Sequence, residues 1–320
     1  MNAIAKYASP LVTTLPLKYQ GKTRDTHVAQ WPDRNDKFRP PLLIVATDRI
    51  STHDVVHQST IQKKGEVLTA LNVFFLTTVL EREALPHHLI ACGSKIYDYL
   101  PGEKSDYPKN LHHRAIVVQQ LDMINVEFIY RAYLAGSFWH KYYSQKKRNP
   151  YGIELPEGLP YMTRFDTMGM GPLFTPTEKS DTDPPLWSEL VEKEYPEAVA
   201  MGREVYAAGR RMLHSVGMES VDTKFELGRN FAGDLMIADE ALTPDSSRFT
   251  PLKEVEVGKE PRWLDKQIAR DEAEKMWGGN PRTPLIFPQP VIDQVSKTYQ
   301  DLTYHITGSW LSTFQRVRLD

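Results

Sequence analysis

The chain has 320 residues, of which 41% are apolar, enough to bury a full core as one large domain or two joined ones. Its formal charge of −2 provides no net positive electrostatic potential that would attract nucleic acid, so no nucleic-acid partner is expected. The single cysteine excludes an internal disulfide, and the opening residues lack the layout of a signal peptide. The longest apolar stretch, Val67 to Leu80, is too short to cross roughly 30 Å of hydrocarbon. We therefore expect a cytoplasmic protein without a membrane partner.

The first third of the chain predicts an α+β unit. Gly21 permits a tight turn within the stretch 19–26, and short runs of branched apolar residues predict buried strands at 42–47 and 114–120. Apolar residues at helical spacing predict a helix between those strands, over 65–83, that ends before Pro86.

The middle of the chain predicts a strand over 126–134 that ends at Gly136 and Ser137. A long loop region, rich in glycine, proline and aspartate, follows over 142–185, and ordered loops of that length tend to be functional. A helix begins at about Pro196 and is capped by Gly217.

The last third predicts a hairpin of strands 221–227 and 233–240, followed by two helices over 264–277 and 291–308. Because strands and helices alternate without a steady βαβ rhythm, the pattern favours an α+β architecture over a doubly wound sheet.

The predicted hairpin carries the strongest concentration of charged side chains. Alternate residues of a strand share a face, so Asp222, Lys224 and Glu226 point one way, while Asp239 and Glu240 end the partner strand. Clustered carboxylates repel one another unless a cation lies between them, and oxygen ligands suit Mg²⁺. The alternative is a solvated face that is held by cross-strand pairs between lysine and acid.

Two further stretches are suited to phosphate. The turn 244–248 offers the hydroxyls of Ser246 and Ser247 and the guanidinium of Arg248, whose donor pair matches a phosphate. Lys22 and Arg24 alternate outward beside Gly21 and can cover a triphosphate, although a plain surface turn explains them as well.

Polar residues also end or interrupt the buried strands. Asp48 and Arg49 are candidates for a simple ion pair, and His53 for a packed or exposed histidine, which leaves Ser51 and Asp54 as candidates for a site. Arg131 lies in an apolar strand and needs an anion or a carbonyl partner if it is buried, and an internal salt bridge would meet that need.

Together these stretches resemble the SAICAR synthetases, the phosphoribosylaminoimidazole-succinocarboxamide synthases of purine biosynthesis. The blocks occur in that family's order and approximate spacing, from Lys18 to about Phe249: GKTRD, LLIVATDRISTHD, KKGEVLTALNVFF, VEFIYRAYLAGS, PLFTPTEKSDTD, DTKFELG and IADEALTPDSSRF.

The resemblance implies a small N-terminal α+β domain over 1–120, shaped like the nucleotide-covering lobe of kinases. A larger ATP-grasp-like domain with a C-terminal helical extension follows over 121–320, with ATP between the two. The implied reaction joins L-aspartate to carboxyaminoimidazole ribonucleotide (CAIR), using ATP and Mg²⁺, and gives SAICAR, ADP and phosphate through an acyl phosphate. A monomer or a small homo-oligomer is expected.

The resemblance also implies roles for single residues. Glu226 and Asp239 would bind Mg²⁺, and Lys224 would stabilise charge near the carboxylate that is activated, with Asp54 as a second candidate catalytic residue. The nucleotide would contact Lys22, Arg24, Lys179 and Glu226, and CAIR would contact Ser51, Arg131, Ser137, Ser247 and Arg248.

Two positions depart from the family pattern, because His53 and Thr250 stand where aromatic residues are usual. Neither is a proposed ligand for phosphate or metal. Two other functions stay open: a small-molecule kinase that stops after phosphoryl transfer, and a nucleotide-binding module without catalysis.

Overall fold

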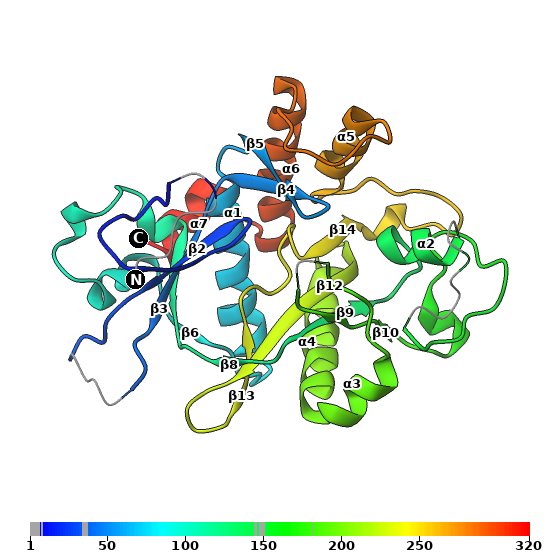
Figure 1. Cartoon of the computed structure of the whole chain (residues 1–320), viewed down its shortest axis with the longest axis horizontal. Coiled ribbons are helices and arrows are strands. Elements are labelled where there is room, and N and C mark those ends of the chain that lie inside the picture. The colour runs from blue at the N-terminus through cyan, green and yellow to red at the C-terminus, as the bar shows by residue number, and fades with distance from the viewer. Residues whose placement is uncertain (1–6, 8, 34–37, 144–145, 147–150, 181) are drawn as a thin grey trace. The chain divides into compact units, whose positions relative to one another are not determined.

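The computed structural model describes residues 7, 9–33, 38–143, 146, 151–180 and 182–320 (Figure 1). Helices and antiparallel sheets are both present, which confirms the predicted α+β class. The chain forms two compact units. Unit 1 comprises Met1–Leu76, His88–Leu121 and Asp265–Asp320, and unit 2 comprises Thr77–His87 and Asp122–Leu264.

Unit 1 is built on an antiparallel five-stranded sheet in the order β1-β2-β3-β7-β6, with β4 and β5 as a separate hairpin. Its strands are β1 (Leu17–Gln20), β2 (Arg24–Val28), β3 (Leu42–Ala46), β4 (Arg49–Thr52), β5 (Val55–Thr60), β6 (Leu89–Cys92) and β7 (Ala115–Val118). Its α-helices are α1 (Lys64–Phe74), α5 (Gln267–Trp277), α6 (Gln289–Thr307) and α7 (Leu311–Arg318), and α1 continues along the chain as a π-helix, Phe75–Leu80.

A buried ion pair holds the β1–β2 turn. The guanidinium of Arg49 contacts both carboxylate oxygens of Asp25, at 2.6 and 3.2 Å, and donates to the main-chain oxygen of Gly21 at 3.0 Å. The suggested pair between Asp48 and Arg49 is therefore wrong. Asp48 instead accepts the main-chain N–H of Gly65 at the start of α1, where a negative charge stabilises the helix.

Gly65 lets α1 pack closely on the sheet. A Cβ atom at this position would lie 2.3 Å from the main-chain oxygen of Ala46 at the end of β3, so no larger residue fits. The close packing of α1 on β3 thus explains the glycine in the KKGE stretch.

The C-terminal helices α6 and α7 pack against α1, as Figure 1 shows. The side-chain amide of Gln315 donates to Glu66 of α1 at 2.6 Å, and the ring of Phe314 lies edge-on to that of Phe74. The expected extent of the second domain, 121–320, thus differs from the observed units, because 265–320 packs within unit 1. Conversely, Thr77–His87 belongs to unit 2.

Unit 2 is built on a seven-stranded antiparallel sheet whose longest strand is β12. Its strands are β8 (Asp122–Met123), β9 (Val126–Arg131), β10 (Leu173–Phe174), β11 (Thr177–Glu178), β12 (Met218–Arg229), β13 (Leu235–Ala238) and β14 (Ser247–Pro251). Its α-helices are α2 (Gly136–Tyr143), α3 (Ser188–Glu194) and α4 (Pro196–Ser215). The sequence indicated a strand end at Gly136 but did not indicate α2.

Helix α4 covers one face of the β9–β12 pair. The hydroxyl of Tyr130 donates to the main-chain oxygen of Val199 at 2.8 Å, and the hydroxyl of Tyr206 donates to that of Ser220 at 2.7 Å. Gly202 allows this approach, because a Cβ atom there would lie 2.4 Å from the hydroxyl oxygen of Tyr130. The opposite face of the two strands is left for charged residues.

Among the described residues, no helix has the length and hydropathy needed to span a bilayer.

His57 in β5 is held as the neutral tautomer with its proton on Nε2. Nδ1 accepts the main-chain N–H of Leu285 at 3.2 Å, so Nε2 donates to the hydroxyl of Thr52 at 2.8 Å. The ring also packs against Phe287, with the ring centroids 4.6 Å apart. Burial, with the positive charge of Lys266, lowers the pKa of His57 to about 4.

A histidine whose pKa falls on folding destabilises the native state as the pH drops below the unfolded value of about 6.5. The free energy of unfolding should therefore fall by about 2 kcal/mol between pH 6.5 and 4 because of this residue. Glutamine does not titrate in this range. In urea titrations, the free energy of unfolding of His57→Gln should therefore depend less on pH than that of the parent. His305→Gln, at an exposed position, is the control, and equal slopes in all three proteins would refute the assignment.

Candidate active site

Five charged residues lie on the face of β9 and β12 that α4 does not cover. Arg131 pairs with Asp222 in the strand register, and Ile129 pairs with Lys224. Because side chains alternate along a strand, Glu127 and Arg131 of β9 share this face with Asp222, Lys224 and Glu226 of β12. The predicted common face of the three β12 residues is confirmed by their contacts.

A lysine–carboxylate cluster occupies one end of this face. The ammonium group of Lys224 lies 2.7 Å from Glu127 and 3.7 Å from Glu226, and Lys179 forms an ion pair with Glu226. Burial alone would lower the pKa of Lys224, but Glu127, Glu226 and Asp239 raise it above its ordinary value. Lys224 is therefore a fixed positive charge at neutral pH and not a proton acceptor.

Glu127 is a member of the cluster that sequence reasoning missed. Burial would raise its pKa, but the charge of Lys224 and the hydrogen bonds from Lys224 and Thr177 lower it. The available signal was its position four residues before Arg131, which places both side chains on the same face of β9.

An arginine pair occupies the other end of the face. Atom Oδ2 of Asp222 accepts from Arg131 at 2.5 Å and from Arg248 at 2.6 Å, and Arg131 also donates to the hydroxyl of Thr175 at 2.9 Å. The suggested internal salt bridge of Arg131 is thus present. Two guanidinium groups share one carboxylate, so this end carries a net positive charge and is suited to an anion.

The start of α2 lies against this arginine pair. Gly136 has φ +55°, and a Cβ atom there would lie 2.2 Å from Cζ of Arg248. Ser137 is the next residue and is exposed, whereas the buried hydroxyl of Ser247 lies 2.7 Å from that of Thr223. Candidate residues from α2, β9, β12 and β14 thus meet around Asp222.

Asp239 lies beside the lysine–carboxylate cluster. Glu226 pairs with Ala238 in the β12–β13 register, and Asp239 is the next residue, in a left-handed conformation with φ +54°. The charge of Asp239 contributes to the raised pKa of Lys224. Mg²⁺ usually binds one or two carboxylates together with substrate phosphates, so Glu226 and Asp239 fit such an ion.

Unit 1 brings two of its candidates together. The ammonium group of Lys22, in the β1–β2 turn, lies 2.5 Å from Asp54, in the β4–β5 turn. Both residues of that second turn, His53 and Asp54, have positive φ values, 48° and 66°, as a two-residue hairpin turn requires.

The other candidates of unit 1 are less exposed than Asp54. Arg24 is half-buried in β2, and Ser51 is buried in β4. His53 is packed, as suggested, with its ring edge-on to that of Trp277.

Comparison with known proteins gives consistent matches. The family model of SAICAR synthetase matches residues 17–283. A phosphoribosylaminoimidazole-succinocarboxamide synthase from Desulfotalea psychrophila is 35% identical over 303 residues, covering 92% of this chain and 96% of the relative. One from Neisseria meningitidis serogroup A is 36% identical over 290 residues, covering 88% and 93%. A solved SAICAR synthase from Saccharomyces cerevisiae, complexed with SAICAR, has a TM-score of 0.79 and 30% identity, covering 95% of this chain and 98% of that one.

The arginine pair shares one carboxylate, so Asp222→Ala removes the counter-ion of the buried Arg131 and one partner of the partly buried Arg248. We expect this change to lower the free energy of unfolding by about 3–5 kcal/mol in urea titrations. Glu192→Ala removes the exposed partner of Arg203 and should cost less than about 1 kcal/mol. Similar losses in the two variants would contradict the role of Asp222.

Proposed function

The chain belongs to the SAICAR synthetase family, and we propose that it joins L-aspartate to CAIR in an ATP-dependent ligation that passes through an acyl phosphate. It is therefore a carbon–nitrogen ligase of purine biosynthesis. The observation that carries the proposal is that the arginine pair, which is suited to an anion, and the lysine–carboxylate cluster lie on one face of β12. Asp222 and Lys224 are two residues apart, which separates these two groups by roughly 7 Å along the strand.

The chemistry requires an activated carboxylate. An amine does not displace oxide from a carboxylate, but it can displace phosphate. In the proposed sequence, a carboxylate oxygen of CAIR attacks the γ-phosphorus of ATP and ADP leaves. The amine of aspartate then attacks the carbonyl carbon of the acyl phosphate, and phosphate leaves with that oxygen while the amine loses a proton.

Lys224 suits the first step as an electrostatic group. Negative charge lies on both the carboxylate and the phosphoryl group, and a fixed ammonium beside them offsets their repulsion. Because its pKa is raised, Lys224 keeps its proton throughout the reaction. Glu127 positions the ammonium group through the 2.7 Å contact.

We propose that Glu226 and Asp239 would hold Mg²⁺, with Lys22, Arg24 and Lys179 on the nucleotide. The ion would neutralise charge on the phosphoryl group that is transferred. Lys179 is half-exposed beside Glu226, so it can turn toward a phosphate without opening the sheet.

The arginine pair suits the ribose phosphate of CAIR. Arg248 and Arg131 supply the charge, and Ser137 follows Gly136, whose Cβ position lies against Arg248. Ser247 stays a candidate from the resemblance, but its buried hydroxyl lies 2.7 Å from that of Thr223, which alternates to the face opposite Asp222. Ser51 and Asp54 stay candidates for the rest of the substrate pocket. A cytoplasmic location and a monomeric or small homo-oligomeric state also remain predictions.

Two other functions make different predictions for phosphate release. A kinase that stops after phosphoryl transfer needs no aspartate, and a module without catalysis binds ATP without turnover. Purified protein with Mg²⁺ and ATP should release phosphate only when CAIR and aspartate are both present, and the product should have the mass of SAICAR. Full turnover without aspartate would support the kinase and refute the ligase.

Replacing Glu226 tests the metal role. Glu226→Gln removes one negative charge beside Lys179 and Lys224, so we expect turnover to be abolished and Mg²⁺–ATP binding to weaken. Calorimetric titration with the nucleotide measures the second effect. The matched control is Glu178→Gln, at an exposed position of β11, which should behave like the parent. Near-normal turnover in Glu226→Gln would remove the metal role.

Replacing Arg248 tests the phosphate role. Loss of a desolvated, charge-assisted contact costs about 2–5 kcal/mol, so Arg248→Ala should raise the KM for CAIR by at least about 30-fold. The KM for aspartate should change much less. An unchanged KM for CAIR would place the phosphate elsewhere.

Gly136→Ala should displace the Arg248 guanidinium without removing its charge. Gly217→Ala is the matched control, because Gly217 also has positive φ, +73°, but open space around its Cβ position. Both variants should lose about 1 kcal/mol of stability from backbone strain. Only Gly136→Ala should raise the KM for CAIR, and equal kinetics in the two variants would contradict the contact.

A further inference from the structure

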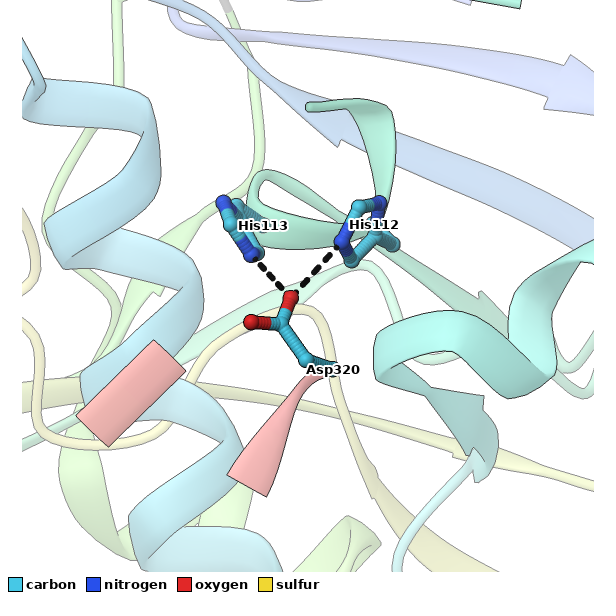
Figure 2. A group of neighbouring side chains, drawn as sticks. All are labelled: His112, His113 and Asp320. Carbon is cyan, nitrogen blue, oxygen red and sulfur yellow. Dashed lines mark hydrogen bonds and ion pairs between the residues drawn. The ribbon is translucent and has the colours of Figure 1, made fainter. Parts of the chain in front are cut away.

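Unit 1 contains a cluster of two histidines and one aspartate that the proposed ligation does not use. His112 and His113 end a short 3₁₀ helix, Leu111–His113, and Asp320 follows α7. Figure 2 shows both imidazole rings turned toward the same carboxylate oxygen. Among the described residues, this is the one group of three or more potential ligands whose donor atoms lie within 4.8 Å of one another.

The donor atoms are close to the arrangement that a metal ion requires. Nε2 of His112 lies 3.0 Å from Oδ1 of Asp320, and Nε2 of His113 lies 2.7 Å from the same oxygen. Ligands of a tetrahedral Zn²⁺ lie about 2.0–2.1 Å from the metal and hence about 3.3 Å apart. The two nitrogen–oxygen separations are about 0.3 and 0.6 Å shorter than this spacing, and all three donor atoms lie within 4.8 Å of one another, so a modest outward movement of the carboxylate would make room for an ion.

The surroundings hold these ligands in place. Nδ1 of His112 lies 3.1 Å from the hydroxyl oxygen of Tyr97. When Nε2 binds a metal, the Nδ1–H group can donate a hydrogen bond to that oxygen. The main chain of Asp320 is held by Ser94, whose hydroxyl donates to its oxygen at 2.9 Å, and by Gln315, whose oxygen accepts its N–H at 3.0 Å. Two segments far apart in the chain are thus fixed beside each other.

The cluster is buried on one side and open on the other. The side chains of His112 and His113 are 7% and 14% exposed, whereas that of Asp320 is 48% exposed. Solvent can therefore supply a fourth ligand. Two imidazole nitrogens and one carboxylate favour Zn²⁺, Co²⁺ or Ni²⁺ over Mg²⁺, which prefers oxygen ligands.

We propose that His112, His113 and Asp320 form a binding site for one divalent transition-metal ion, separate from the Mg²⁺ that accompanies ATP. In the metal-bound state each histidine binds through Nε2 and keeps its proton on Nδ1. The ion joins the end of α7 to the 3₁₀ helix before β7, so it stabilises unit 1 by mass action.

Co²⁺ is a suitable probe, since its visible absorption reports nitrogen ligands and the assay needs no catalysis. Chelator-treated parent protein should bind one Co²⁺ per chain, Zn²⁺ should displace it, and excess Mg²⁺ should not. The thermal midpoint should rise with Zn²⁺. Tyr97→Phe should weaken the affinity about 10–100-fold through the loss of the partner of His112.

His113→Gln and Asp320→Asn should each abolish the Co²⁺ absorption, with circular dichroism confirming that both variants fold. His305→Gln, on the exposed surface of α6, is the matched control and should bind like the parent. No absorption with the parent, or unchanged binding by both His113→Gln and Asp320→Asn, would overturn the proposal and leave the cluster as an ion pair only.

Discussion

The two-residue period of β12 is the constraint on which the candidate active site depends. This twelve-residue strand pairs with β8, β9, β13 and β14, so its register is fixed along both edges. From Asp222 to Glu226, one set of alternate side chains packs under α4, and the other set carries the charges. The anion site at Asp222 and the lysine–carboxylate cluster at Lys224 therefore have a separation that the backbone sets, which is the preorganisation that catalysis between two bound substrates needs.

The two ends of this face have different charge balances, and the difference suits different ligands. Arg131 and Arg248 share one carboxylate, which leaves an excess positive charge, and we propose that it binds the substrate phosphate. Lys224 and Lys179 instead lie among several carboxylates, and we propose that an incoming Mg²⁺–nucleotide exchanges partners with them. Buried charges of this kind are costly unless each has a partner, so the network is both a structural requirement and a binding surface.

Much of the fold follows from local sequence patterns, whereas the partners of charged residues depend on tertiary structure. The turn at Gly21, the β12–β13 hairpin and the common face of Asp222, Lys224 and Glu226 follow from glycine placement and strand alternation. The pairing of Arg49 with Asp25 instead of Asp48 does not, since it requires β4 to lie beside the β1–β2 turn. The periodicity of α6 predicted a helix but could not indicate that it packs on α1, and α7 was not predicted at all. Likewise, no local signal brings Asp320 to His112, 208 residues away.

In the proposed reaction, the carboxylate of CAIR is phosphorylated before aspartate attacks it. The most direct measurement uses CAIR with ¹⁸O in both carboxylate oxygens, followed by mass analysis of the phosphate and of SAICAR. If CAIR is phosphorylated first, one labelled oxygen should appear in the released phosphate and the other should stay in the amide product. Phosphate without the label would contradict the acyl phosphate and the role assigned to Lys224.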